Sequence, residues 1–376
     1  MMIYHMTGAY PADSAVPDPD YCHYGAGVFL PLLRHLEGEL QGVVRDDDPE
    51  YVHRCRVATR RIRAAMPLFP SCFPPRRRKK WERRIRILTR SLGAARDLDV
   101  QIAFVRSVLD ERRAPDDPSP AVFSPAEVVS SRSSHTALAP LPDAPGITLR
   151  SRIRTWIRGR RVTGTRLPVP SDPALSPSPD PHPVPSDPAV TGLECLLLRL
   201  IQQRRVMQPA VAEVATGFIG SGVIEDFSRY LQEVKVHSLL RGTGTISQAS
   251  YETVFLRIMA GIGSLLWYEQ YLSDPSSVDQ HHAMRIMAKK LRYTLEAYSG
   301  LYPRSLKGEI RVIKRLQDLL GDIHDCDVWT SLLPRFLDEE ESRSVAFFGN
   351  HRFFDQVRPG ILMLTVSIAL PFLACL

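Results

Sequence analysis

Two stretches of this sequence carry a histidine followed by basic residues at helical spacing. HRCRVATRRIR begins at His53, and HAMRIMAKKLR begins at His282. On a helix, the basic residues of each stretch share one face and the apolar residues share the opposite face. A guanidinium binds two phosphate oxygens at once, and an imidazole can donate to another, so the pattern predicts phosphate recognition. The predicted contacts are His53, Arg56, Arg60 and Arg63 in the first stretch and His282, Arg285, Lys289 and Arg292 in the second.

A further basic stripe follows each of these stretches. Its members are Lys79, Arg83, Arg86 and Arg90 after the first stretch and Lys307, Arg311 and Lys314 after the second. A solvated helix face is the simpler explanation of one such stripe, but solvated faces usually mix both signs. Like charges four residues apart destabilise a helix. Repeated stripes of one sign therefore favour an anionic ligand, and we expect these residues to contact it as well.

Paired aspartates lie downstream of both basic stretches. LGAARDLDV begins at Leu92 and contains Asp97 and Asp99, and LGDIHDCDV, from Leu320, contains Asp325 and Asp327. Two carboxylates at i and i+2 on a helix point about 200° apart, so they do not easily chelate one ion. We expect one aspartate of each pair to hold an interior arginine and the other to meet solvent.

The two pairs of motifs indicate an internal repeat. The histidine motifs are 229 residues apart and the aspartate motifs 228 residues apart. Two separate motifs that recur at nearly the same offset predict two similar helical halves, related by a pseudo-two-fold axis.

The elements that must position these residues are helices, because little of the sequence alternates with period two. Residues 114–190 are rich in Pro and Ser and predict a disordered insertion, in which 150–161 is a basic patch. The predicted domain organisation is a tail at 1–20, a first half at 21–113, the insertion at 114–190, further helices and the second half at 191–345, and a divergent apolar C-terminus at 346–376. The predicted helices are 24–44, 50–70, 76–94, 97–112, 192–216, 222–240, 248–273, 278–300, 304–320 and 325–341.

The charge balance points to a polyanionic partner. The formal net charge is +7, and residues 53–113 alone hold 18 Lys and Arg against 5 Asp and Glu. Such a local excess favours nucleic acid, an anionic membrane surface or a phosphate polymer.

The cysteines and the chain ends predict a cytoplasmic protein. The six cysteines are far apart and form no CxxC pair, so we expect buried free thiols and no zinc site or disulfide framework. The first twenty residues lack the features of a secretory signal. Residues 361–376 are uncharged but shorter than the about 20 residues of a membrane span. They predict a buried final helix interrupted at Pro371, with a membrane-contacting tail anchor as the alternative.

The stretches VHRCRVATRRIR, LGAARDLDV, HHAMRIMAKKLRYTLE and LQDLLGDIHDCDV resemble the signatures of the CHAD family, the histidine-bearing α-helical domain. The resemblance covers about 24–112 and 191–341. It implies an all-α fold of two four-helix bundles with internal two-fold symmetry. It also implies a basic central cavity that binds inorganic polyphosphate without catalysis or a cofactor, in a protein associated with polyphosphate granules. The histidine motifs and the basic residues that follow them would line this cavity.

Two other functions remain open from the sequence. His282, His324 and Asp325, with a further aspartate such as Asp327, are similar to the metal ligands of HD phosphohydrolases, although Arg96 occupies the position of His324 in the first half. Nucleic acid is the other alternative partner, because any polyanion releases counterions on binding. Base stacking would require exposed aromatic rings among the basic residues, and the candidates are Trp81 and Tyr293.

Overall fold

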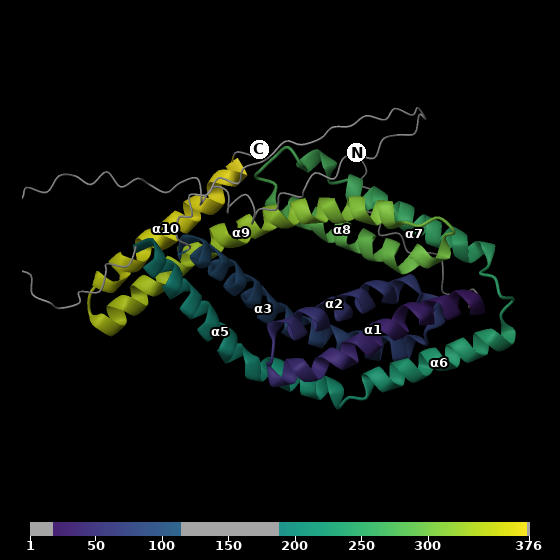
Figure 1. Cartoon of the computed structure of the whole chain (residues 1–376). Helices are drawn as coiled ribbons and strands as arrows, with labels where there is room; N and C mark the ends of the chain where they lie inside the picture. The colour runs from purple at the N-terminus through teal and green to yellow at the C-terminus, as the bar shows by residue number, and fades with distance from the viewer. Residues whose placement is uncertain (1–17, 114–187, 374–376) are drawn as a thin grey trace, which may run out of the picture.

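A computed structural model describes residues 18–113 and 188–373 of the chain, and this part is all-α, with no strand. Figure 1 shows long helices that run nearly side by side over most of their length. The first half contains α1 (Pro19–Arg45), α2 (Pro49–Ala65), α3 (Pro75–Arg113), α5 (Pro188–Ile219) and α6 (Val223–Arg241). The second half contains α7 (Gln248–Leu266), α8 (Val278–Tyr298), α9 (Lys307–Phe348) and α10 (Arg352–Leu373). Short 3₁₀ turns are η1 (Met66–Leu68), η2 (Pro70–Cys72), η3 (Glu269–Tyr271) and η4 (Ser299–Leu301).

Local sequence explains where several helices begin. The carboxylate of Asp18 accepts hydrogen bonds from the backbone of Asp20 and Tyr21, and Pro19 occupies the first helical position of α1. Asp48 and Pro49 begin α2 in the same way. These side chains satisfy amide groups that have no partner inside the helix.

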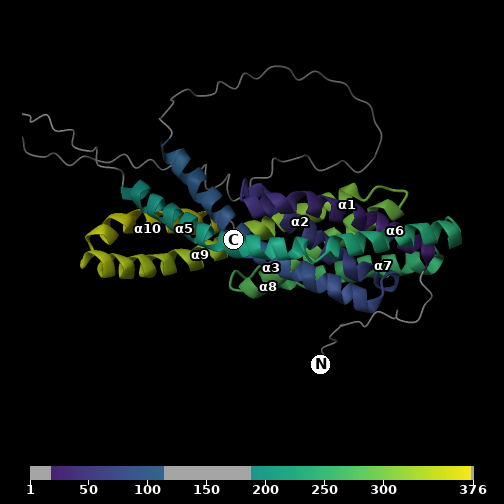
Figure 2. The same ribbon diagram turned by 90° about the horizontal axis from the view of Figure 1, so that it is seen from below.

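Three groups of buried side chains form the core. The largest lies mainly in the first half, where α1, α2, α3, α5 and α6 pack around Phe29, Phe69 and Phe227, and it also includes Val254 of α7 and Tyr298 of α8. A smaller one lies between α7, α8 and the start of α9, around Met284 and Leu291. The third joins the halves, because the C-terminal parts of α3 and α9 pack with α5 and α10. Figures 1 and 2 show these four segments together at one end of the molecule.

The predicted all-α class is confirmed, but the structure corrects several predicted boundaries. Ranges 76–94 and 97–112 form one continuous helix, α3, and ranges 304–320 and 325–341 are both part of α9. Gly93 and Gly321, near the predicted ends, lie within these helices, and neither glycine has a positive φ. The insertion lies almost entirely outside the described residues, and the pseudo-two-fold relation of the halves stays a prediction.

The C-terminal segment packs against the protein, as predicted. Val357, Ile361, Leu364 and Ile368 recur on one side of α10 and are buried against α5 and α9. The predicted interruption at Pro371 is wrong, since α10 runs to Leu373. Within the ranges 18–113 and 188–373, no helix has the length and apolarity needed to cross a bilayer.

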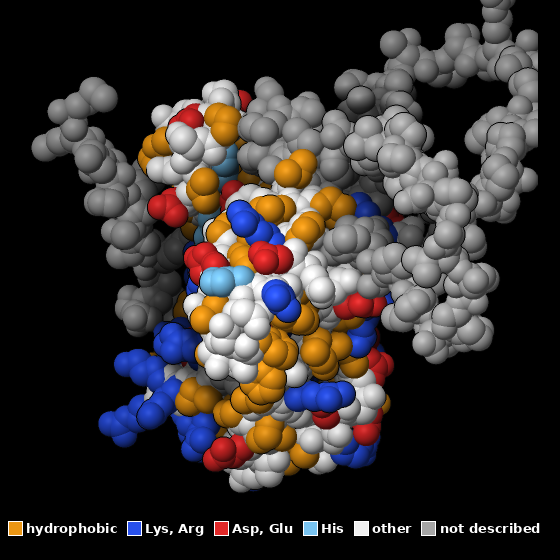
Figure 3. Space-filling model, turned by 90° about the vertical axis from the view of Figure 1, so that its left-hand side faces the viewer, with side chains coloured by type: hydrophobic (Ala, Val, Ile, Leu, Met, Phe, Trp, Pro, Cys, Tyr) orange, Lys and Arg blue, Asp and Glu red, His pale blue; other side chains and the backbone are white. Residues whose placement is uncertain are grey.

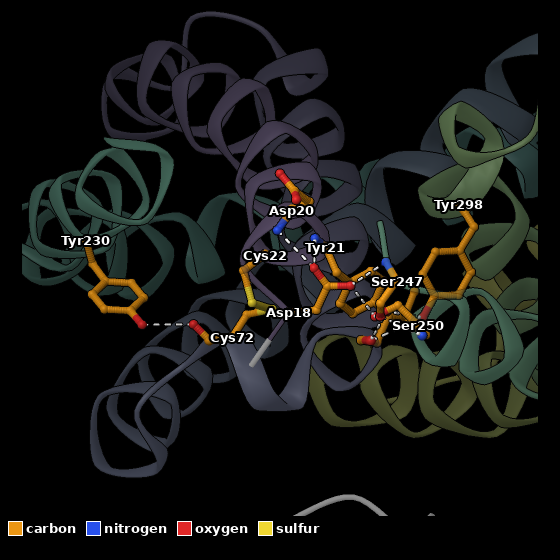
Figure 4. The surroundings of a disulfide bond; sticks show 10 residues. Asp18, Asp20, Tyr21, Cys22, Cys72, Tyr230, Ser247, Ser250 and Tyr298 are labelled. Carbon is orange, nitrogen blue, oxygen red and sulfur yellow. Dashed lines mark hydrogen bonds between the residues drawn. A yellow bond between two sulfur atoms is a disulfide. The ribbon is translucent and has the colours of Figure 1, made fainter. Parts of the chain in front are cut away.

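The prediction of free thiols throughout is wrong for one pair of cysteines. Cys22 in the first turn of α1 and Cys72 in η2 form a disulfide (Figure 4), although 50 positions separate them. The chain turns back between α2 and α3, and this brings the two Cα atoms to 5.2 Å. Spacing along the sequence could not show this proximity. Cys55 and Cys195 are free thiols.

Candidate functional site

Helices α2 and α8 come from different halves and place four basic side chains near one another. Each helix buries its apolar face, which includes Ile62 in α2 and Leu291 in α8. Their half-buried basic residues therefore lie on the remaining faces, and α2 packs against α8. We call the set Arg56, Arg60, Arg285 and Lys289 the central cluster.

The cations of the central cluster destabilise one another's charge. Burial, together with the charges of Arg285, Arg60 and Arg56, lowers the pKa of Lys289 to about 7. Burial also lowers the pKa of Arg56 and of Arg285, and the neighbouring cations of the cluster add to the effect. The cluster is thus a region of concentrated, partly desolvated positive charge.

The guanidiniums of the central cluster have unused hydrogen-bonding capacity. Nε of Arg56 and Nε of Arg285 are both buried and have no hydrogen-bond partner among the described residues. A Cβ atom at Gly93 would lie 3.9 Å from Nε of Arg56, and one at Gly321 would lie 3.8 Å from Nε of Arg285. In both halves, the arginine of the basic helix therefore lies close to the corresponding glycine of the next long helix. A buried donor without a partner is costly, and an anion could satisfy both of these donors.

Arg63 extends the positive charge toward α3. Burial lowers its pKa, and the charges of Arg86 and Arg90 lower it further. These three residues are predicted contacts that the fold brings together. Arg63, Arg86 and Arg90 are exposed, as are the remaining members of the second stripes. No described contact links those remaining members to the central cluster: Lys79 and Arg83 on α3, and Lys307, Arg311 and Lys314 on α9.

The two motif histidines occupy corresponding environments. Burial and the charge of Arg96 lower the pKa of His53. His282 lies beside His324, with 3.3 Å between their Nδ1 atoms. Burial, then Arg285 and His282, lower the pKa of His324 to about 4, so His324 is neutral near pH 7. Arg96 and His324 occupy matching positions in the repeat, and each lies near the histidine that begins a basic stripe.

Tyr293, which the sequence offered only as a candidate for base stacking, lies beside arginines of both motif helices. Two guanidiniums lie near its ring, with Cζ of Arg60 at 6.0 Å and Cζ of Arg292 at 4.8 Å from the ring centroid. Glu296 pairs with Arg292 at 3.6 Å and with Arg61 at 3.5 Å. The sequence signal for these contacts was the pair Arg292-Tyr293 followed three residues later by Glu296. The contacts with α2 could not be read from the sequence, because only packing brings α2 alongside α8.

The carboxylates of the first half behave as expected. Asp99 is buried and holds Arg204 of α5 at 2.9 Å, whereas Asp97 is mostly exposed and lies 3.6 Å from Arg56. In the second half, Asp325 lies close enough to favour the charged form of Arg285. Asp327 differs from Asp99, because it lies near His281 and His282, and burial raises its pKa.

Comparison with known proteins identifies the family. The sequence model of the CHAD domain family matches residues 27–334 of this chain. This chain belongs to the CHAD-domain family. The crystal structure of the CHAD domain from the plant Ricinus communis is similar over 93% of each chain, with a TM-score of 0.52 and 19% identity. That similarity supports the fold. No curated protein matches the chain.

This CHAD domain also contains a pocket beside the central cluster. A cavity of about 540 Å³ between α5, α8 and α9 includes His282, His324 and Asp327 in its lining. Its other charged residues have both signs: Arg199 and Arg335 with Asp279 and Glu339. The mixed charge makes it a weaker anion site than the central cluster. Across residues 18–113 and 188–373, no three His, Cys, Asp or Glu side chains lie close enough to hold a metal ion.

The surface charge differs from the charge of the central cluster. On the face in Figure 3, Lys and Arg gather along one edge, whereas Asp and Glu are scattered between apolar side chains. Exposed positive charge is therefore not what we use to choose the candidate site. We choose it because half-buried cations from α2 and α8 converge there.

Proposed function

We propose that this CHAD domain binds inorganic polyphosphate without catalysing its breakdown, in a basic cavity centred on the central cluster. One observation carries the proposal: Arg56 and Arg285 hold matching, buried Nε donors without partners, next to Lys289, whose charge is disfavoured. A bound phosphate would accept from these donors and stabilise the protonated form of Lys289. The CHAD resemblance, which implies polyphosphate binding, supports the same ligand.

The arrangement favours a chain of phosphates over a single ion. The cations continue from the central cluster to Arg63, Arg86 and Arg90 on α2 and α3. His53 and His282 begin the two stripes. A polymer could contact these groups in succession, whereas one phosphate could satisfy only a few of them.

Nucleic acid fits the described residues less well. Neither of the two aromatic side chains considered for base stacking is an open platform. Trp81 is fully buried against Phe227, and the half-buried ring of Tyr293 already has the guanidiniums of Arg60 and Arg292 beside it. Without stacking platforms, a nucleic acid would be held mainly through its phosphates.

Calorimetric titration with polyphosphates of defined length tests the proposal. We expect saturable binding that weakens steeply between about 0.1 and about 0.5 M salt, because binding releases counterions. The double variant Arg60→Glu/Lys289→Glu should lose binding while circular dichroism shows unchanged helicity. Binding by this variant at wild-type affinity would show that the central cluster is not the site.

A control variant separates local from overall charge. Arg205→Glu/Arg241→Glu makes the same change in net charge at two exposed positions. It should retain most of the affinity. DNA that displaced polyphosphate at equal phosphate concentration would contradict the choice of ligand. Release of phosphate in the presence of Mg²⁺ or Mn²⁺ would contradict the absence of catalysis.

A further inference from the structure

Lys289 of α8 differs in its surroundings from the lysine that follows it in the sequence. Its half-buried side chain lies near Arg285 of its own helix and near Arg56 and Arg60 of α2. Among the described residues, no carboxylate forms an ion pair with its amino group. The side chain of Lys290, by contrast, is exposed to solvent. The two adjacent lysines therefore offer a comparison within one helix.

The surroundings of Lys289 favour its neutral form. Burial, and then the three arginines of the central cluster, disfavour the ammonium, whereas Asp325 of α9 favours it less strongly. His324 of α9 also lies near this group, but it is neutral near pH 7 and adds no charge there. With a pKa of about 7, Lys289 is mostly a neutral amine at about pH 7.5. A lysine in solvent, with a pKa of about 10.4, is then only about 0.1% neutral.

The central cluster also has donors that can hold a phosphate next to this amine. Nε of Arg56 and Nε of Arg285 are buried and have no hydrogen-bond partner among the described residues. The charges of both arginines act on Lys289, so an anion that they bind lies close to its amino group. A lysine that neighbouring cations keep neutral is an activated nucleophile. A phosphate site beside such a nucleophile can orient a phosphorylated reactant for attack.

We propose that Lys289 is a modification site, at which its side-chain amine takes the acyl group from a small acyl phosphate held by Arg56 and Arg285. The amine nitrogen attacks the carbonyl carbon, a C–N bond forms, and the C–O bond between the acyl group and the phosphate breaks. The phosphate leaves with the electron pair of that bond and takes up the proton that the nitrogen loses. The products are an amide at Lys289 and hydrogen phosphate, and no further reactant is needed.

This modification would regulate the anion site. The amide is not protonated, so acylation removes the charge that a bound polyanion would stabilise on Lys289. We expect acylated protein to bind polyphosphate more weakly and bound polyphosphate to protect Lys289 from acylation. In this respect alone the inference rests on the proposed function, because acylation itself requires an anion site and not a polymer.

Treatment of the full chain with acetyl phosphate, with tandem mass spectrometry of its peptides, tests the proposal. At about pH 7.5, Lys289 should be acetylated about tenfold faster than Lys290, because its larger neutral fraction outweighs its lower basicity. The rate at Lys289 should level off above about pH 8, whereas the rate at Lys290 should rise toward about pH 10. Equal rates at the two lysines, or a rate at Lys289 that does not level off, would overturn the proposal.

Two further reagents separate phosphate recognition from the reactivity of the amine. Excess inorganic phosphate should slow acetylation of Lys289 by acetyl phosphate and leave Lys290 unaffected. An uncharged donor, p-nitrophenyl acetate, lacks the phosphate and should show a smaller preference for Lys289 than acetyl phosphate does. An equal preference with both donors, together with no effect of inorganic phosphate, would contradict the role of the arginines.

Calorimetry on treated protein tests the regulatory consequence. Treatment with acetyl phosphate should lower the polyphosphate affinity of the wild-type protein and of the matched control Lys290→Arg, but it should not change the affinity of Lys289→Arg. An equal loss of affinity in Lys289→Arg would place the effective modification elsewhere and contradict the proposal. Selective acetylation of Lys289 in a protein that does not bind polyphosphate would support the modification site and contradict only the proposed function.

Discussion

At the scale of single residues, the central cluster concentrates positive charge at the expense of stability. Lys289 would keep its charge more easily in solvent, yet α8 holds it beside Arg285 and the arginines of α2, where its pKa is about 7. In the unfolded chain its pKa returns to about 10.5. The folded, anion-free protein therefore binds fewer protons than the unfolded chain between about pH 7 and pH 10.5, so its stability rises with pH across that window. Below about pH 7 the full cost of the buried charge is present.

Replacing Lys289 tests the cost of this charge. We expect Lys289→Met to stabilise the anion-free protein at pH 6 by about 1–3 kcal/mol, because an apolar side chain of similar length removes the desolvated charge. The gain should shrink toward about pH 10, where wild-type Lys289 is neutral in the folded state. Urea unfolding at several pH values measures the difference. The same variant should bind polyphosphate more weakly, and a loss of stability at pH 6 would contradict the assigned environment.

Polyphosphate binding should also take up protons. A bound anion raises the pKa of Lys289 from about 7, so binding near pH 7.5 draws a proton from the buffer. Affinity should increase as pH falls from about 8 to about 6. Calorimetry in two buffers of different ionisation enthalpy counts the protons. The Lys289→Met variant supplies the control, because its proton uptake should be smaller.

At the scale of elements, the disulfide and the hydrogen bonds around it hold the turn between α2 and α3. Figure 4 shows Cys22 joined to Cys72, whose carbonyl accepts a hydrogen bond from Tyr230 of α6. Nearby, the hydroxyls of Tyr21 and Tyr298 both donate to the carbonyl of Leu68, which connects α1, η1 and α8. This turn sets the position of α2 relative to α3, and these two helices carry the arginines of the first half.

Removal of the disulfide should weaken the fold. Closing a loop of this length contributes up to about 4 kcal/mol in the chain-entropy account. Urea unfolding with and without a dithiol reductant should show a loss for the wild-type protein and no reductant effect for Cys72→Ser. Cys195→Ser, at a free cysteine, should behave like the wild type. Equal stability of the oxidised and reduced wild-type protein would show that the link has no energetic role.

At the scale of the whole molecule, the central cluster lies where the two halves meet. The largest core belongs mainly to the first half but also includes Val254 of α7 and Tyr298 of α8, and α3, α5, α9 and α10 share a further core at one end of the molecule. The central cluster lies at a second contact, between α2 and α8, where like charges repel. Packing elsewhere in the molecule therefore holds together a contact that charge alone would open.

Bound polyphosphate should offset the repulsion between the cations of the central cluster and so stabilise the whole protein. Polyphosphate at about 100 times its dissociation constant should add about 2.7 kcal/mol to the free energy of unfolding. Thermal unfolding with increasing polyphosphate measures the effect as a rise in Tm, and high salt should abolish it. The Arg60→Glu/Lys289→Glu variant should show no rise. A similar rise in this variant would place binding outside the central cluster.

The sequence by itself determined the helical class, the faces of the basic helices and the recurrence of their motifs. These follow from local periodicity, which a helix displays wherever it packs. The apolar residues around Ile62 and Leu291 settled which faces are buried, so the half-buried position of Arg56 and Arg285 could be anticipated.

Only the tertiary structure decided which stripes meet. It brought α2 against α8, paired Asp99 with Arg204 and joined Cys22 to Cys72. It also left several predicted contacts on the exposed sides of their helices, namely Lys79 and Arg83 on α3 and Lys307, Arg311 and Lys314 on α9. All of these outcomes depend on contacts between residues far apart in the chain. Periodicity fixes the direction of a side chain around its own helix, but the position of one helix against another follows from how the whole core packs.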